Sequence, residues 1–337
     1  EAFDEEVRPD YHTRLAPRQA PWSNAALWKR WLQRNRASSA FSLSTGHSYG
    51  GIIAANEAAF AAHPEYYAMV DNIRQTNGSK FCISNPGLRQ LVTDYAVGVM
   101  QASPDRDSVS MEPSDGGGWC ECGACADMGS VSDRVLWLAN DVARAINALG
   151  HGPRYVGMYA YNEHSPPPAI AGHSNVIVNI ATSFIRGGYS VEELVEGWRA
   201  SGVTLGIRDY HDVFTWSHDL PRRARGGNLS YLSETIPFFY ERRARFMNSE
   251  SSDSWGANGL GYWLSPLMLW DVDQARRLDV WIDDFLNRAF DTAASPMRAF
   301  YELLNIDHAL QTDENVIARM YTCLAEAYAC EPSPAVR

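Results

Sequence analysis

The chain alternates between short apolar runs that end in polar or aromatic residues and longer stretches with apolar residues at helical spacing. The clearest helical stretch is 132–149, where Val135, Leu138, Val142 and Ile146 recur every three or four residues. A strand, a loop and a helix in repeated order are typical of βα units around a parallel sheet. The pattern therefore predicts an α/β fold.

The apolar runs predict eight β-strands, at 40–47, 80–85, 108–115, 155–163, 176–183, 204–212, 245–251 and 259–265. Helices are predicted at 54–62, 86–100, 132–149, 191–200, 231–242 and 271–289, with two more near 296–310 and 314–329. Eight strand–helix steps in about 260 residues predict a closed (β/α)8 barrel of the TIM type with extra C-terminal helices. An open doubly wound sheet is the alternative, but the Gly-rich phosphate turn that often marks it is missing.

The predicted domain organisation follows from these elements. We expect residues 1–38 to be an N-terminal extension packed on the barrel, 39–290 to form the barrel, and 291–337 to form C-terminal helices. Between residues 35 and 310 the sequence contains no obvious linker, repeat or low-complexity stretch.

Composition narrows the classes of function. The 337 residues carry a net charge of −11, which disfavours binding to a phosphate backbone, and no apolar run approaches the length of a membrane span. Aromatic residues make up 12% of the chain, including 11 Trp, and many stand beside polar residues. Aromatic faces beside polar groups suit sugar recognition, although filling a large core is the alternative.

Carboxylates gather at the predicted strand ends, where a barrel places its active site. Glu163 follows the fourth predicted strand and Glu250 ends the seventh. Hydrolysis of a glycosidic bond uses two carboxylates, one to protonate the leaving oxygen and one to attack or activate water. Asn162-Glu163 with Glu250 resembles the large clan of retaining glycoside hydrolases, which implies Glu163 as acid/base and Glu250 as nucleophile.

Other strand-end and aromatic residues are candidates for substrate binding, although a cap, an ion pair or a core position is the alternative for each. Asn162 would bond a sugar hydroxyl, as the resemblance to that clan implies. Glu112 and His164 also stand at strand ends, but without an assigned role. The candidates for substrate binding are His47, Asp115, Asn162, Asp209, Tyr210, His211, Trp216, Trp255 and Trp263.

Four cysteines form the densest chemical signal. Cys120, Cys122 and Cys125 lie within six residues, and Cys82 falls in the predicted strand next to the one that precedes them. Four thiolates would make a closed, structural Zn²⁺ site with no open position for catalysis, so no cofactor is expected for the chemistry itself. Disulfides are the alternative, although a bridge between Cys120 and Cys122 would be strained.

The run 108–125, with its Glu-Pro, triple-Gly and three-Cys segments, resembles the signature of the bacterial family named domain of unknown function 4838. Further segments carry the resemblance: 63–66, 82–86, 166–168, 269–271 and 296–297. The resemblance implies a glycoside-hydrolase-like barrel, distantly similar to alpha-glucuronidases and hexosaminidases. It also implies an exported protein, secreted or periplasmic, that acts on polysaccharides.

We therefore expect a glycoside hydrolase with a carbohydrate substrate and no nucleic-acid partner. A non-catalytic carbohydrate-binding barrel and a metal-dependent hydrolase are the alternatives. The sequence indicates neither the substrate sugar and its linkage nor the oligomeric state.

Overall fold

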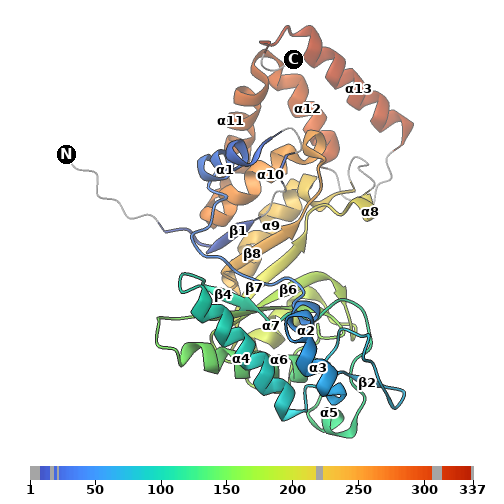
Figure 1. Ribbon diagram of the computed structural model, residues 1–337. Coiled ribbons are helices and arrows are strands. Elements are labelled where there is room, and N and C mark those ends of the chain that lie inside the picture. Colours follow the sequence, from blue (N-terminus) through green and yellow to red (C-terminus); the bar gives the residue numbers. More distant parts are fainter. Residues whose placement is uncertain (1–7, 16–18, 21–22, 218–222, 306–312, 335–337) are drawn as a thin grey trace, which may run out of the picture. The chain divides into compact units, whose positions relative to one another are not determined.

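The chain divides into two compact units, each of which is described by itself. The computed structural model describes residues 8–15, 19–20, 23–217, 223–305 and 313–334. Unit 1 comprises Glu1–Ser39, Asp209–Arg243 and Met247–Arg337, and unit 2 comprises Ala40–Arg208 and Ala244–Phe246. Figure 1 shows the helices and strands of both units, labelled where there is room.

The main sheet has six strands in the order β1-β8-β7-β6-β5-β4. These strands are β1 (Thr13–Leu15), β4 (Ser108–Ser110), β5 (Tyr155–Asn162), β6 (Val176–Ile185), β7 (Thr204–Tyr210) and β8 (Phe246–Glu250). The pairs β4–β5, β5–β6 and β6–β7 are parallel, as predicted. Among the described residues the sheet is an open half-barrel, so the prediction of a closed (β/α)8 barrel is wrong.

Two predicted strands of unit 2 are missing because their backbone groups are used differently. In 40–47 the amides of Ser42 and Ser44 bond the side chains of Asp107 (2.8 Å) and Ser108 (2.7 Å), and His47 makes the one bridge to Glu112. Side-chain acceptors take the place of a backbone ladder there. The segment 80–85 makes a bridge at Phe81 and then turns.

The third missing strand, 259–265, lies inside helix α10 (Trp255–Trp270) of unit 1. Eleven of its sixteen residues are buried, so the helix has no polar face and its apolar run resembles a buried strand. Gly261 shows how closely it packs, because a Cβ atom there would lie 1.7 Å from the carbonyl oxygen of Gly226.

Helices in unit 2 begin at the caps that the sequence provides. Helix α4 (Pro86–Ala102) starts where the Asn85 side chain accepts from the amides of Gly87 and Leu88. In α6 (Val131–Asn147), Ser130 and Asp133 form a capping box. Both helices pack against each other, and α6 also packs on β5, while α7 (Val191–Ala200) packs on β6. Residues 176–181 of β6 are fully buried, as expected of a parallel strand covered on both faces.

The remaining elements of unit 2 are short. They are α2 (Tyr49–Ala55), α3 (Glu57–Ala62), η1 (Pro64–Tyr66), the antiparallel ribbon of β2 (Met69–Val70) and β3 (Ile73–Arg74), and α5 (Gly123–Asp127). Of these elements, β2 packs its Met69 against the cysteine cluster and α5 carries Cys125.

Unit 1 is mainly helical. Besides α10 it contains α1 (Ala25–Arg34), α8 (Phe214–Ser217), η2 (Arg225–Gly227), α9 (Leu229–Glu241), η3 (Val272–Arg277), α11 (Leu278–Phe290), η4 (Asp291–Ala293), α12 (Ala294–Leu304) and α13 (Glu314–Ala329). In the described part of the chain, no helix is both long enough and apolar enough to cross a membrane.

Candidate functional site

A buried acid–histidine pair lies at the carboxyl ends of β4 and β5 in unit 2. The Glu112 side chain is fully buried, and its Oε1 atom lies 3.1 Å from Nε2 of His164, which is also buried. Its other oxygen accepts a 2.7 Å hydrogen bond from the amide of Tyr159. Glu112 therefore ties the segment after β4 to the middle of β5 and orients the His164 ring.

His47 stands beside this pair but reaches solvent. Its Nδ1 atom lies 2.6 Å from the carbonyl oxygen of Pro113 and 3.9 Å from Glu112, and 44% of its side chain is exposed. A bond from Nδ1 to the carbonyl leaves Nε2 as the acceptor of the neutral ring. His47 is thus a predicted binding residue that a ligand could contact.

A buried lysine completes the interior of this region. The ammonium of Lys80 donates to the carbonyl oxygens of Ser114 and Asp115 and lies 4.7 Å from the ring centre of Trp119. Burial lowers the pKa of Lys80, and the charges of Glu112 and Asp115 oppose that shift. The sequence indicated neither Lys80 nor the Glu112–His164 pair as site residues. The one local sequence feature that could have indicated this pair is the carboxylate of Glu112, which stands beside Pro113 just after β4.

The outer edge of the same region holds Glu163. Its carboxylate lies 3.4 Å from Nε of Arg186, which also donates a 2.9 Å bond to the Asn162 side chain. Glu163 is 44% exposed, so the pair is a surface contact that leaves the carboxylate accessible. Asn162 has φ +50° and Phe184 φ +59°, conformations that side chains other than glycine seldom adopt and that cluster at functional sites.

Asp115 and Tyr161 extend this edge. The Tyr161 hydroxyl donates to Asp115 at 3.3 Å, and the Tyr161 ring lies 6.4 Å from the His47 ring and 5.4 Å from Phe184. The sequence predictions His47, Asp115, Asn162 and Glu163 therefore gather in one region of unit 2.

A second acid–histidine pair occurs in unit 1, after β7. Asp209 and His211 are both fully buried, with Oδ2 and Nε2 3.3 Å apart. The Tyr231 hydroxyl lies 3.0 and 3.1 Å from the two carboxylate oxygens of Asp209. The guanidinium of Arg225 lies 3.6 Å from Oδ1 of Asp209. Burial and the Asp209 charge raise the pKa of Tyr231 above its ordinary value.

Glu250 ends β8 next to this pair. Its carbonyl oxygen accepts the amides of His211 (2.8 Å) and Asp212 (3.1 Å), which fixes the chain path there. Tyr210 packs its ring 5.3 Å from that of Trp216, which is 44% exposed. The predictions Asp209, Tyr210, His211, Trp216 and Glu250 therefore all belong to unit 1.

The other two predicted aromatic residues lie on α10. Trp255 makes edge contacts with Trp28 and Trp31, at 5.9 and 5.3 Å. Trp263 donates its Nε1 proton to Asn35 at 2.9 Å and packs 5.4 Å from Phe285. Trp263 therefore lies inside a helix and not at the strand end that the sequence predicted, and Trp255 begins the same helix.

The four predicted cysteines do converge in unit 2. The sulfur atoms of Cys82, Cys120, Cys122 and Cys125 lie within 4.8 Å of one another, and these cysteines are free thiols. Cys82 lies 3.7 Å from Cys122 and 3.9 Å from Cys125. A tetrahedral ion with sulfur ligands at about 2.3 Å would space them by about 3.8 Å. The cluster therefore fits a metal ion.

Donors around the cluster also suit thiolates. The amide of Met69 donates to the sulfur of Cys120 (3.3 Å), and the amide of Ser84 donates to that of Cys125 (3.4 Å). Hydrogen bonds with Cys120 and Cys125 lower the pKa of Cys82, whereas those with Cys125 and Cys82 raise the pKa of Cys120. A bound cation would favour the charged form of all four thiols.

Comparison with known families adds one finding. The family described as Domain of unknown function (DUF4838) matches residues 2–302. The chain belongs to this family. The predicted DUF4838 membership is thus confirmed, whereas the glycoside-hydrolase-like barrel that it implied is not. A search of the curated proteins finds no match to this DUF4838 chain.

Proposed function

We propose that this protein hydrolyses O-glycosidic bonds in a polysaccharide or its oligosaccharides. The observation that carries the proposal is the setting of Glu163, an accessible carboxylate after parallel strand β5, beside Asn162 in a left-handed conformation. His47, Asp115 and Tyr161 add polar groups that could bond sugar hydroxyls, and Phe184 adds an exposed apolar ring.

In this proposal Glu163 acts as general acid/base. It protonates the glycosidic oxygen as the bond to the anomeric carbon breaks, and later takes a proton from the attacking water. The sequence predicts Glu250, which ends β8 in unit 1, as the nucleophile, and its own substitution tests that prediction separately. The buried Glu112–His164 pair holds β5 and its neighbouring segment in position and does not react.

Single substitutions test these roles on a panel of aryl glycosides and oligosaccharides. Glu163→Gln should lower kcat about 100-fold or more, and most for poor leaving groups, because departure of such groups needs the proton. Glu250→Gln should lower kcat for all leaving groups, because no covalent intermediate forms. Both variants should still bind the oligosaccharide in isothermal titration calorimetry.

A matched control comes from α7. Glu196 pairs with Arg199 as Glu163 pairs with Arg186, with 42% of its side chain exposed. Glu196→Gln should therefore leave kcat unchanged. A wild-type protein that binds glycans but turns over none of the panel would establish the non-catalytic alternative.

We further propose that the cysteine cluster holds a structural Zn²⁺ ion. Four thiolates form a closed coordination shell with no open position for substrate or water, so this ion would contribute to folding rather than to the reaction. It would join the 80–85 segment to the segment before α6, and the amide of Met69 in β2 would bond the ligand sulfur of Cys120. A chelator that lowered kcat while the fold remained intact would instead indicate a metal-dependent hydrolase.

A further inference from the structure

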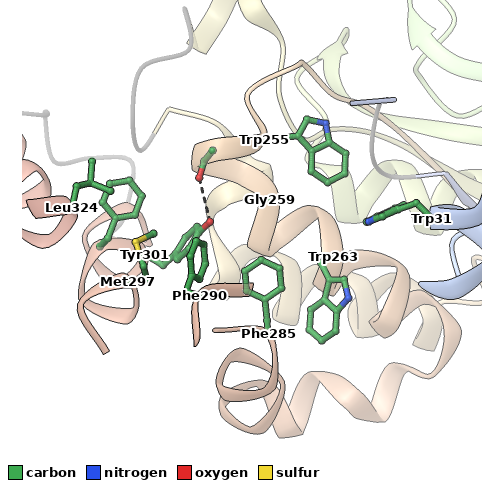
Figure 2. Close-up of a pocket in the computed structure, with 11 residues that line it drawn as sticks. Trp31, Trp255, Gly259, Trp263, Phe285, Phe290, Met297, Tyr301 and Leu324 are labelled. Atoms are coloured by element: carbon green, nitrogen blue, oxygen red, sulfur yellow. Dashed lines mark hydrogen bonds between the residues drawn. The ribbon is translucent and has the colours of Figure 1, made fainter. Parts of the chain in front are cut away.

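Unit 1 contains an aromatic pocket that plays no part in the proposed reaction. The pocket has a volume of about 590 Å³, within the range of small-molecule sites. Figure 2 shows its side chains around the stretch of α10 that carries Gly259, with Trp31 at one end and Leu324 at the other. It is lined by Trp31, Trp255, Gly256, Gly259, Trp263, Phe285, Phe290, Met297, Phe300, Tyr301 and Leu324.

The rings form walls at contact distance. Phe285 lies 5.4 Å from Trp263 and 6.3 Å from Tyr301, and Trp31 meets Trp255 at 88°. The residues come from α1, α10, α11, α12 and α13, all in unit 1. Four of these helices thus bring aromatic rings together around a space that they do not fill, and α13 adds Leu324.

Two glycines line the pocket on α10. A Cβ atom added at Gly256 would meet nothing within 4 Å, and one at Gly259 would meet only Trp255, at 3.9 Å. Glycine is the least favourable helix residue after proline, so a side chain at either position would favour the helix and find room. Because neither glycine has a side chain, a flat group can approach the backbone of α10 closely there.

Two polar side-chain atoms of the lining are engaged with the protein. The Tyr301 hydroxyl donates to the carbonyl oxygen of Gly256 at 3.2 Å, the bond dashed in Figure 2, and burial raises the pKa of Tyr301 to about 12. Trp263 donates its ring proton to Asn35. A ligand rich in hydroxyl groups would lose bonds to water here without replacing them.

We propose that this pocket is a binding site for a small, uncharged ligand with an aromatic or other apolar ring, which lies against the Gly256–Gly259 face of α10. Ring-against-ring packing supplies the attraction, and the bare helix backbone supplies the fit. The lining of the pocket includes neither Glu163 nor Glu250, and this proposal does not depend on the glycosidase function.

The test uses N-phenyl-1-naphthylamine, a neutral fluorophore with aromatic rings, and the full chain. We expect one molecule to bind with a dissociation constant on the order of 10 µM, with brighter probe emission and quenched tryptophan emission. Gly259→Leu places a side chain in the pocket and should weaken binding at least about tenfold. Gly98→Leu is the matched control, because Gly98 lies on α4 of unit 2 with nothing within 4 Å of a Cβ atom. It should leave binding unchanged.

Circular dichroism establishes that each variant folds. If Gly259→Leu does not fold, Gly256→Ala and Leu324→Ser, at the edges of the pocket, replace it and should each weaken binding. Absence of probe binding, or equal binding by all pocket variants, overturns the proposal. So does displacement of the probe by oligosaccharides, which indicates a sugar site, or loss of the probe on self-association, measured by light scattering, which indicates a second copy of the chain.

Discussion

The interior of unit 2 and the interior of unit 1 are stabilised by different kinds of contact. In unit 2, irregular segments are tied by directional groups: four sulfurs within 4.8 Å, a buried Glu112–His164 pair, and Asp133 bonded to the amides of Ala169 and Ile170. In unit 1, helices meet through aromatic rings that leave a pocket of about 590 Å³. Directional bonds specify one geometry, whereas ring packing tolerates a hollow that a ligand can use.

Breaking the sulfur cluster should give the largest effect. Cys125→Ser, or removal of the metal by a chelator, should lower the free energy of unfolding by about 4 kcal/mol or more, because metal binding is coupled to folding. Thermal unfolding with elemental analysis checks this, with one zinc per chain expected in the wild type. Cys323→Ser is the control, since Cys323 is buried outside the cluster and should retain the zinc. Equal zinc content in Cys125→Ser would contradict the assignment.

Substitutions of two glycines on α10 compare a closely packed position, Gly261, with a position that lines the pocket, Gly256. Gly261→Ala should cost about 3 kcal/mol, because its Cβ atom would fall 1.7 Å from the Gly226 carbonyl oxygen. Gly256→Ala, five residues earlier, should be neutral or stabilise by about 0.5–1 kcal/mol. Urea denaturation of both variants measures the difference. Similar losses in both would mean that the pocket is filled.

Removing Asp133 tests the directional contacts of unit 2. Asp133→Ala deletes the capping box of α6 and the acceptor for two loop amides, and should cost about 2 kcal/mol at pH 7. Burial raises the pKa of Asp133, but the bonds from Ser130, Ala169 and Ile170 outweigh it and lower the pKa overall. Its stabilisation is therefore full above about pH 4 and is lost as the pH falls through the folded-state pKa. The gap between variant and wild type should narrow below pH 4 in denaturant titrations.

The exposed counterpart of that cap should give the smallest effect. Glu193 closes the capping box of α7 with Ser190, but among the described residues it accepts from no loop amide beyond that box. Glu193→Ala should shift the unfolding midpoint only slightly, measured in the same titrations. A loss as large as that of Asp133→Ala would show that the loop contacts of Asp133 contribute little.

Local patterns predicted some elements well. Five of the eight predicted strands are present as β4 to β8, and α4, α6 and α7 lie within two residues of their predicted ranges. The prediction failed for 259–265 because a helix buried on all sides has no period, and for 40–47 because side chains took the place of backbone partners.

For the candidate site, the sequence indicated which residue types could react or bind better than it indicated which residues contact each other. It identified the cysteines, three of which are neighbours in the chain, but it assigned no role to the buried Glu112–His164 pair, whose members are 52 residues apart. It proposed Trp255 and Trp263 for sugar stacking, whereas both line the aromatic pocket of unit 1.

The sequence alone determined the parallel βα pattern, three of the four clustered cysteines and the family, because each depends on residues close together in the chain or on an extended match to the DUF4838 sequences. Only the tertiary structure decided that the sheet stays open, that 259–265 is helical, and that aromatic residues of four helices surround a hollow. Those features depend on contacts between distant segments, whose energies no local pattern encodes.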